Sequence, residues 1–201
     1  SLWPGLVRTI MYNLNRQQSN IHIFESGLRF IYQDNEIKQE LVISGALFGN
    51  VFQEQWAETG RKVDFYDLKG DVEALLELTG QAQKFTFKPA NHPALHPGQS
   101  ASIVSDGKVI GFLGAIHPKV LQNLGVSANI YVFELDVDGI SHVAIPKFHA
   151  LSKYPSIRRD IAIVVDEQVA AGDIQSCIAA TFADMLNDIV LFDVYKGVSV
   201  D

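Results

Sequence analysis

Residues 101–114 read ASIVSDGKVIGFLG, and they contain a strong turn signal between two runs of strand-forming residues. The turn is Asp106-Gly107, and the runs are 101–105 and 109–114. A two-residue Asp-Gly connection matches the twist of two paired strands, so this stretch predicts an antiparallel hairpin.

Further strand-like segments lie on both sides of this hairpin. Residues 21–32 are β-branched or aromatic at roughly alternate positions, and residues 41–48 form a similar run after a polar stretch at 33–40. Shorter runs follow at 84–88 and 130–137. The pattern predicts several antiparallel strands, the first two of them around a polar excursion.

Three segments have the apolar spacing of helices instead. The first starts near Pro4 and should end between residues 17 and 20, with Leu6, Val7, Ile10, Met11 and Leu14 on one face. The second covers 65–78 with Gly80 as its C-terminal cap, and the third covers 118–124. Together with the strands, they predict an α+β fold.

The composition restricts the class of protein. The chain has 201 residues, of which 47% are hydrophobic and 19% charged, and its net charge is −7. It contains no apolar run of about 20 residues and no secretory signal pattern, so we expect a soluble protein without a membrane partner. Its single cysteine, Cys177, is expected to be a small buried residue on a helix, and a reducing cytoplasm fits.

The C-terminal quarter has a different pattern from the rest. After a mixed segment at 141–151, a buried strand is expected at 160–165, a helix at 171–185 and a strand at 189–200. Such a β-α-β unit cannot bury both faces of its sheet alone. We therefore expect an incomplete second domain.

Three histidines are candidates for chemistry. A small hydrolase is an alternative, and it would depend on His92, His96 and His117. Such an enzyme would hold a metal ion or a histidine with a shifted pKa. Pro97 and Gly98 interrupt any helix that would present His92 and His96 together, and no third zinc ligand is evident. We therefore expect no metal site.

A local basic segment lies inside this acidic chain. Residues 147–160 contain one acidic residue, Asp160, and four basic residues, namely Lys147, Lys153, Arg158 and Arg159. Tyr154, Arg158 and Arg159 offer an aromatic ring and two guanidinium groups, which suit base stacking and phosphate contacts. These three residues are the candidate RNA-binding residues, although a solvated strand entrance with one arginine paired to an acid would look the same.

Several longer motifs are similar to those of the bacterial phenylalanyl-tRNA synthetase beta subunit. They cover essentially the whole chain in the expected order. The motifs are LWPGL at 2–6, YNLNR at 12–16, FESGLRF at 24–30, DFYDLKGD at 64–71, HPGQSA at 96–101, GFLGAIHP at 111–118, YPSIRRDIA at 154–162 and LFDVY at 191–195.

This resemblance implies two domains. Residues 1–145 would form a catalytic-like module with the antiparallel sheet and flanking helices of class II synthetases. Residues 146–201 would begin the ferredoxin-like anticodon-binding domain. The chain would then be a C-terminal fragment of the subunit, without the second half of that domain and without the N-terminal modules.

The resemblance also implies that the module has lost its nucleotide site. Glu134 and Asp136 stand where the catalytic alpha subunit has glycines that approach ATP, and Gly139 stands near the place of an arginine. Carboxylates facing a triphosphate would repel it by about a few kcal/mol. No residue of this chain is therefore given a catalytic role.

The function implied is support of another subunit's catalysis. The chain would assemble with the alpha subunit, in a holoenzyme of two alpha and two beta chains, and bind phenylalanine tRNA. ATP and magnesium are implied for the intact enzyme and no cofactor for this chain. A pure assembly module without RNA contact stays open, as does the role of the first helix, which could face the other subunit or pack on its own sheet.

Overall fold

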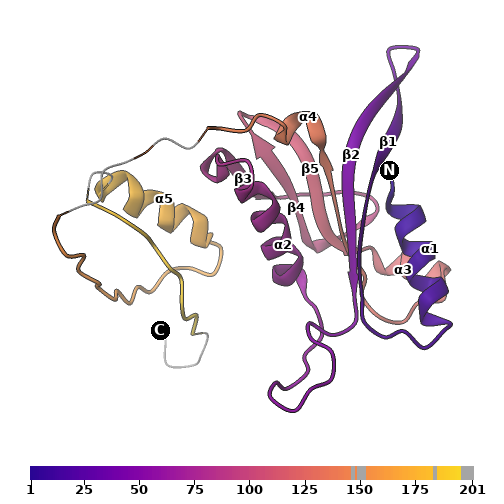
Figure 1. The fold of residues 1–201 in the computed structure, drawn as a ribbon, viewed down its shortest axis with the longest axis horizontal. Coiled ribbons are helices and arrows are strands. Elements are labelled where there is room, and N and C mark those ends of the chain that lie inside the picture. Colours follow the sequence, from indigo (N-terminus) through magenta and orange to yellow (C-terminus); the bar gives the residue numbers. More distant parts are fainter. Residues whose placement is uncertain (146–147, 149–152, 183–184, 196–201) are drawn as a thin grey trace. The chain divides into compact units, whose positions relative to one another are not determined.

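The computed structural model describes residues 1–145, 148, 153–182 and 185–195. The chain forms two compact units, residues 1–148 and residues 149–201. The first unit is a six-stranded sheet with helices on both of its faces (Figure 1). Across the described residues, each helix is too short or too polar to cross a membrane.

In its described residues, the first unit consists of six strands, four α-helices and one short 3-10 helix. In chain order they are α1 (Trp3–Leu14), β1 (Ile21–Gln33), β2 (Glu36–Phe48), α2 (Phe65–Glu77), η1 (Ala82–Lys84), β3 (Phe85–Pro89), β4 (Leu95–Ser105), β5 (Lys108–Ile116), α3 (Pro118–Asn123), β6 (Tyr131–Asp136) and α4 (Val137–Ile140).

All neighbouring strands of the sheet are antiparallel, in the order β1-β2-β6-β5-β4-β3. The predicted hairpin is confirmed as β4 and β5, with Asp106 and Gly107 at φ values of 49° and 77°. Strand β4 begins at Leu95, before the run at 101–105 from which the hairpin was predicted. The pairing of β4 with β5 shifts register between Leu95 and Ser100, as at a β-bulge.

The polar excursion expected at residues 33–40 is instead the end of a long hairpin. Strand β1 continues to Gln33 and β2 starts at Glu36. Asp34 and Asn35 make the turn with φ values of 54° and 66°, which these two residue types tolerate better than most. The charged residues Glu36, Lys38 and Glu40 lie at alternate positions of β2, so they occupy one face of the strand and do not interrupt it.

Helix α1 packs against its own sheet. Leu6, Val7 and Ile10 are buried among residues of β1, β2 and β6, and Met11 and Leu14 pack at the edge of the same cluster. The helix ends at Leu14, earlier than expected. Since its apolar face is already covered, that face is not available to another subunit.

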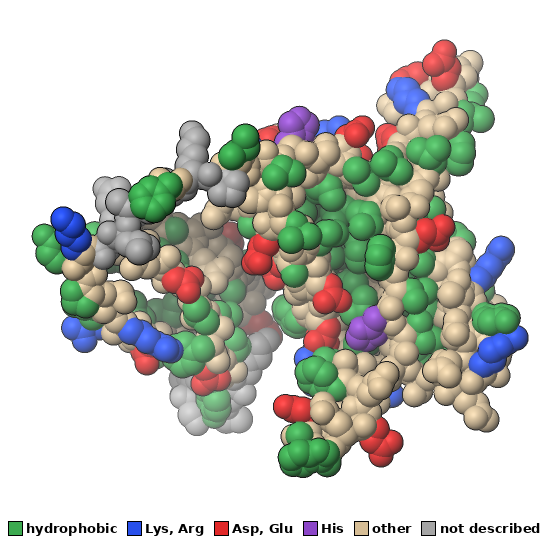
Figure 2. All heavy atoms as spheres, viewed as in Figure 1, with side chains coloured by type: hydrophobic (Ala, Val, Ile, Leu, Met, Phe, Trp, Pro, Cys, Tyr) green, Lys and Arg blue, Asp and Glu red, His purple; other side chains and the backbone are tan. Residues whose placement is uncertain are grey.

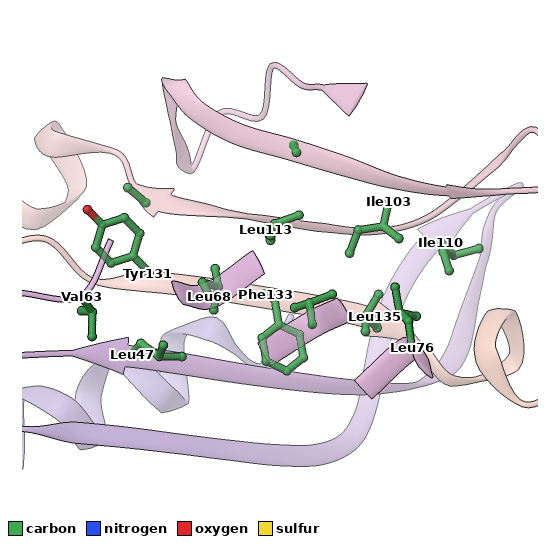
Figure 3. Close-up of a cluster of buried hydrophobic side chains, with 13 residues drawn as sticks. Leu47, Val63, Leu68, Leu76, Ile103, Ile110, Leu113, Tyr131, Phe133 and Leu135 are labelled. Atoms are coloured by element: carbon green, nitrogen blue, oxygen red, sulfur yellow. The ribbon is translucent and has the colours of Figure 1, made fainter. Parts of the chain in front are cut away.

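Helix α2 covers the opposite face of the sheet (Figure 3). Leu68, Val72 and Leu76 of this helix are buried against Phe133 and Leu135 of β6 and other strand residues. Asp64 caps its N-terminus by accepting hydrogen bonds from the backbone N–H of Tyr66 and Asp67. Its end agrees with the prediction, because Gly80 has a φ of +67°.

The second unit contains one described helix, α5 (Ala171–Phe182), inside the range predicted. Cys177 lies on it but is exposed, so its expected burial is wrong. The prediction of a strand at 160–165 is also wrong. These residues are exposed, and they belong to no sheet in the described part of the chain. Residues 189–195 form no strand either, and 183–184 and 196–200 lie outside the described residues.

Both strand predictions fail for the same physical reason. A strand is stable only when a neighbouring strand takes up its backbone hydrogen bonds and a packing layer covers its apolar face. Within 153–182 and 185–195, only α5 is regular, and none of its residues is buried. Apolar sequence alone therefore does not produce a strand here.

Candidate functional site

Glu134 lies near the centre of the sheet with its carboxylate almost completely buried. Its main chain belongs to β6, and its side chain is 7% exposed. One carboxylate oxygen accepts hydrogen bonds from Ser1 Oγ at 2.8 Å and from the backbone N–H of Leu2 at 2.9 Å. The other accepts from Arg29 Nη1 at 3.1 Å. Both oxygens are thus occupied by the chain's own donors.

Arg29 joins two carboxylates on this face of the sheet. Its guanidinium donates to Glu40 from Nε at 2.8 Å and from Nη2 at 2.6 Å, in addition to the bond to Glu134. Burial lowers the pKa of Arg29, but the hydrogen bonds to Glu40 and Glu134 outweigh it and raise that pKa above its ordinary value. The group is a fully charged link between β1, β2 and β6.

Three rings cover the sheet beside Glu134. The ring of His92 lies 5.2 Å from Trp3 and 5.1 Å from Phe112, measured between ring centroids. Trp3 Nε1 donates to the backbone oxygen of Phe133 at 3.0 Å, which fixes the start of α1 over β6. Phe112 is the direct cross-strand partner of Glu134. The three rings thus pack together on the face of the sheet that carries the Glu134 side chain.

The other two residues of the expected degenerate nucleotide site have structural contacts. Asp136 caps α4 by accepting from the backbone N–H of Asp138 at 3.1 Å. Gly139 packs so closely on β5 that an added Cβ would lie 2.7 Å from Ile110 Cγ2. A larger residue would therefore separate α4 from the sheet.

These surroundings do not suit a nucleotide. A triphosphate would meet the negative charges of Glu134, Glu40 and Asp136, and the guanidinium of Arg29 is the cation bonded to this group. Arg29 is already bonded to two of those carboxylates. In the part of the chain that the structure describes, no three His, Cys, Asp or Glu residues form a group that could hold a metal ion.

The three candidate histidines each stabilise a local turn. In each, Nδ1 accepts a hydrogen bond from the backbone N–H two residues later: His92 from Ala94, His96 from Gly98 and His117 from Lys119. Each histidine precedes a proline, which has no N–H of its own to offer. This common role as a turn acceptor accounts for their spacing without catalysis.

Two of the quoted motifs meet on the other face of the sheet. Residues of α2 and of β4 line a shallow cavity of about 600 Å³, with Tyr131 at the same cavity. Its lining includes Asp64, Phe65, Tyr66 and Lys69 from the first motif, and Pro97, Gly98, Gln99, Ser100 and Ala101 from the second. The cavity is separated from the side chain of Glu134 by the sheet.

The candidate RNA-binding residues lie in the second unit and are exposed. Tyr154 is 85% exposed, and Arg159 is also exposed. Arg158 Nε lies 3.5 Å from Asp160 Oδ1, and both side chains are mostly exposed. Asp160 thus forms an exposed ion pair with Arg158. Exposed pairs of this kind are weak, so the guanidinium of Arg158 stays accessible to a phosphate.

Two important residues of the Glu134 site were not predicted as such. Arg29 has the same strand parity as Ile21 and Ile23, so it points to the covered face of β1. A charged residue at such a position requires a buried partner of opposite sign, and that is the signal that could have identified it. Trp3 offers no comparable signal, because its contacts lie about 90 to 130 residues away.

Comparison with known families finds two matches along the chain. Residues 1–137 match the family model for the phenylalanyl tRNA synthetase beta chain CLM domain. The chain belongs to the phenylalanyl-tRNA synthetase beta chain family. Residues 152–201 match the model for the ferredoxin-fold anticodon binding domain.

Individual relatives in this family match the chain along its whole length. The phenylalanine–tRNA ligase beta subunit of Pseudomonas fluorescens is 48% identical over 201 residues, that of Aliivibrio fischeri 46% over 204 and that of Hahella chejuensis 45% over 200. Each alignment includes 100% of this chain but only 25% or 26% of the relative. The chain thus corresponds to about a quarter of a beta subunit.

Proposed function

We propose that this chain is a non-catalytic part of the beta subunit of a phenylalanine–tRNA ligase. It would support the ATP-dependent attachment of phenylalanine to its tRNA by assembling with the alpha subunit and by binding tRNA. The observation that carries this proposal is the match of the whole chain to beta subunits at 45–48% identity.

The first unit would be a class II synthetase module that has no active site of its own. Its six-stranded antiparallel sheet with helices on both faces supports the architecture. The carboxylate of Glu134, already bonded to Ser1 and Arg29, and the rings packed on the same face of the sheet support the loss of nucleotide binding. ATP and magnesium are therefore assigned to the intact enzyme and not to residues of this chain.

The second unit would contact tRNA. The family description of residues 152–201 names an anticodon-binding domain. Tyr154, Arg158 and Arg159 are exposed and belong to its first residues, so they are the proposed contacts. Stacking on the tyrosine and charge-assisted bonds to phosphate would be the chemistry.

The intact enzyme would be a cytoplasmic assembly of two alpha and two beta chains. Of the alternatives, an assembly module without RNA contact differs only in the role of the second unit. A histidine-dependent hydrolase is disfavoured by the turn bonds of His92, His96 and His117.

Phenylalanine-dependent exchange between ATP and pyrophosphate tests the proposal. The assay compares this chain alone, the purified alpha subunit alone, and full-length beta with alpha. We expect activity only from the complete pair. Exchange catalysed by this chain alone would show that Glu134, Asp136 and Gly139 do not mark a lost nucleotide site.

A further inference from the structure

One face of the β1–β2 hairpin is mostly apolar and exposed, with Ser26 and Gln39 as its polar members. Hydrophobic side chains are visible on this projecting hairpin in Figure 2. Six residues form what we call the hairpin strip: Phe24 (77% exposed), Leu28 (46%), Phe30 (63%), Tyr32 (71%), Ile37 (68%) and Leu41 (45%). The strand register places all six on the same face, with Leu28 opposite Leu41 and Tyr32 opposite Ile37.

The two faces of this hairpin differ sharply in charge. The strip face carries no charged side chain from Phe24 to Tyr32 or from Ile37 to Ile43. The opposite face carries the charged residues, namely Glu25, Arg29, Glu36, Lys38 and Glu40. An exposed apolar face of this kind is typical of a surface that meets a packing partner.

The strip continues the face of the sheet that α2 covers. Helix α2 contacts β5 and β6, and the short helix α4 contacts β6 and β2. Strands β2 and β1 come next in the sheet, and the strip residues lie on them. Two strands span about 10 Å, which is also the usual distance between packed helices. A helix beside α2 would therefore fit over the strip.

The length and area of the strip also suit a helix. From Phe24 to Tyr32 the strand rises about 26 Å, the length of an α-helix of about 18 residues. At roughly 150–200 Å² for each fully exposed side chain, the strip exposes about 550–750 Å². That area is close to the roughly 800 Å² that one partner contributes to a stable interface.

We infer that the hairpin strip is the docking surface for an amphipathic helix of the alpha subunit. The inference rests on the proposed function, which supplies the partner. A second copy fits less well, because each copy has a net charge of −7 and would bring its own α2 onto the same face. RNA is disfavoured because the strip has no cation to neutralise phosphate.

Calorimetric titration of this 201-residue chain with purified alpha subunit tests the inference. The variant is Phe30→Asp, and the matched control is Gln33→Asp, which adds the same charge to an exposed site on the opposite face of β1. We expect at least a tenfold loss of affinity for Phe30→Asp and less than a twofold change for Gln33→Asp. Binding to the unchanged chain should show a negative heat-capacity change, as apolar burial requires.

A second variant guards against misfolding. The double change Phe30→Ala and Tyr32→Ala removes apolar area without adding charge, and circular dichroism checks that each variant keeps its fold. A folded variant of either kind with unchanged affinity would overturn the inference. So would self-association of the chain that Phe30→Asp abolishes while alpha binding stays the same.

Two further results separate the inference from the proposed function. If the unchanged chain and full-length beta both fail to bind the alpha subunit, the proposed assembly function falls, and the inference falls with it. If full-length beta binds alpha normally but Phe30→Asp lowers its melting temperature in the absence of alpha, the strip is covered from within the beta subunit. That result would overturn the inference alone.

Discussion

Arg29 Nη1 donates to Glu134 Oε1 at 3.1 Å, although 105 residues separate the two positions. The two strands that carry them, β1 and β6, are not neighbours, because β2 lies between them. The bond therefore crosses the intervening strand and ties the outer hairpin to the centre of the sheet. Glu134 also holds the N-terminal residues over the sheet, so one carboxylate joins three parts of the fold.

Replacing Glu134 by glutamine should lower the stability of the first unit. Glu134→Gln keeps the shape of the side chain but removes the charge that faces Arg29, and we expect a loss of about 1–3 kcal/mol in the free energy of unfolding. Urea denaturation measures this loss. Glu58→Gln, at an exposed loop position, removes the same charge and should change stability by less than about 0.5 kcal/mol. Equal midpoints for both variants would contradict the structural role of Glu134.

The imidazole of His92 should make stability depend on pH. Burial lowers the pKa of His92 below its ordinary value of 6.5, and the nearby charge of Glu134 opposes this only in part. The unfolded chain therefore takes up the proton first as the pH falls. The stability that neutral His92 contributes is complete above about pH 6.5 and is lost as the pH falls through the lowered pKa.

The variant His92→Asn isolates this effect, because asparagine can accept the same turn hydrogen bond without titrating. We expect its melting temperature to fall less than that of the unchanged chain between pH 7.5 and pH 5.5. His22→Asn, at an exposed position, is the control and should leave the decrease as it is. A decrease of the same size in all three proteins would refute the assignment.

The ion pair between Arg61 and Asp67 should stabilise the start of α2 above the acid range. The hydrogen bonds from Arg61 lower the pKa of Asp67 below 3.8, burial opposes them, and the backbone N–H of Asp64 adds to the lowering. The ion pair's contribution to the free energy of unfolding is present above about pH 4 and is lost as the pH falls through the lowered pKa of Asp67. We therefore expect Arg61→Gln to lower the urea midpoint more at pH 6 than at pH 2.5.

The exposed Arg8 provides the control for this prediction. Arg8→Gln removes a positive charge from α1, and it should not reproduce the pH-dependent difference. If Arg61→Gln shifts the midpoint equally at both pH values, the effect does not come from the carboxylate of Asp67.

Removing both arginines of the second unit should weaken tRNA binding. In the full-length beta subunit with alpha, Arg158→Ala together with Arg159→Ala should lower the affinity for phenylalanine tRNA and reduce the dependence of log K on log salt by about 1–2. Filter binding at several salt concentrations measures both. Lys108→Ala with Lys119→Ala removes two exposed charges from the first unit and should leave the slope unchanged. An unaltered slope in the arginine variant would favour the assembly module without RNA contact.

Local signals in the sequence were sufficient for most elements of the first unit. The hairpin at Asp106-Gly107 and the end of α2 at Gly80 were predicted correctly, because turn and cap residues act on their immediate neighbours. The lengths of β1 and β2 were predicted less well. Alternating charges look polar along the chain, but they occupy one face of a strand.

The amino-acid sequence alone determined the family, the antiparallel strands and the helices, because these depend on motifs and on contacts between residues close in the chain. Only the tertiary structure decided which groups meet across the sheet. Arg29 with Glu134 and Trp3 with Phe133 are contacts over 105 and 130 residues, and no local spacing specifies them. The same holds for the segment 160–165, whose apolar residues form a strand only where another strand lies beside them.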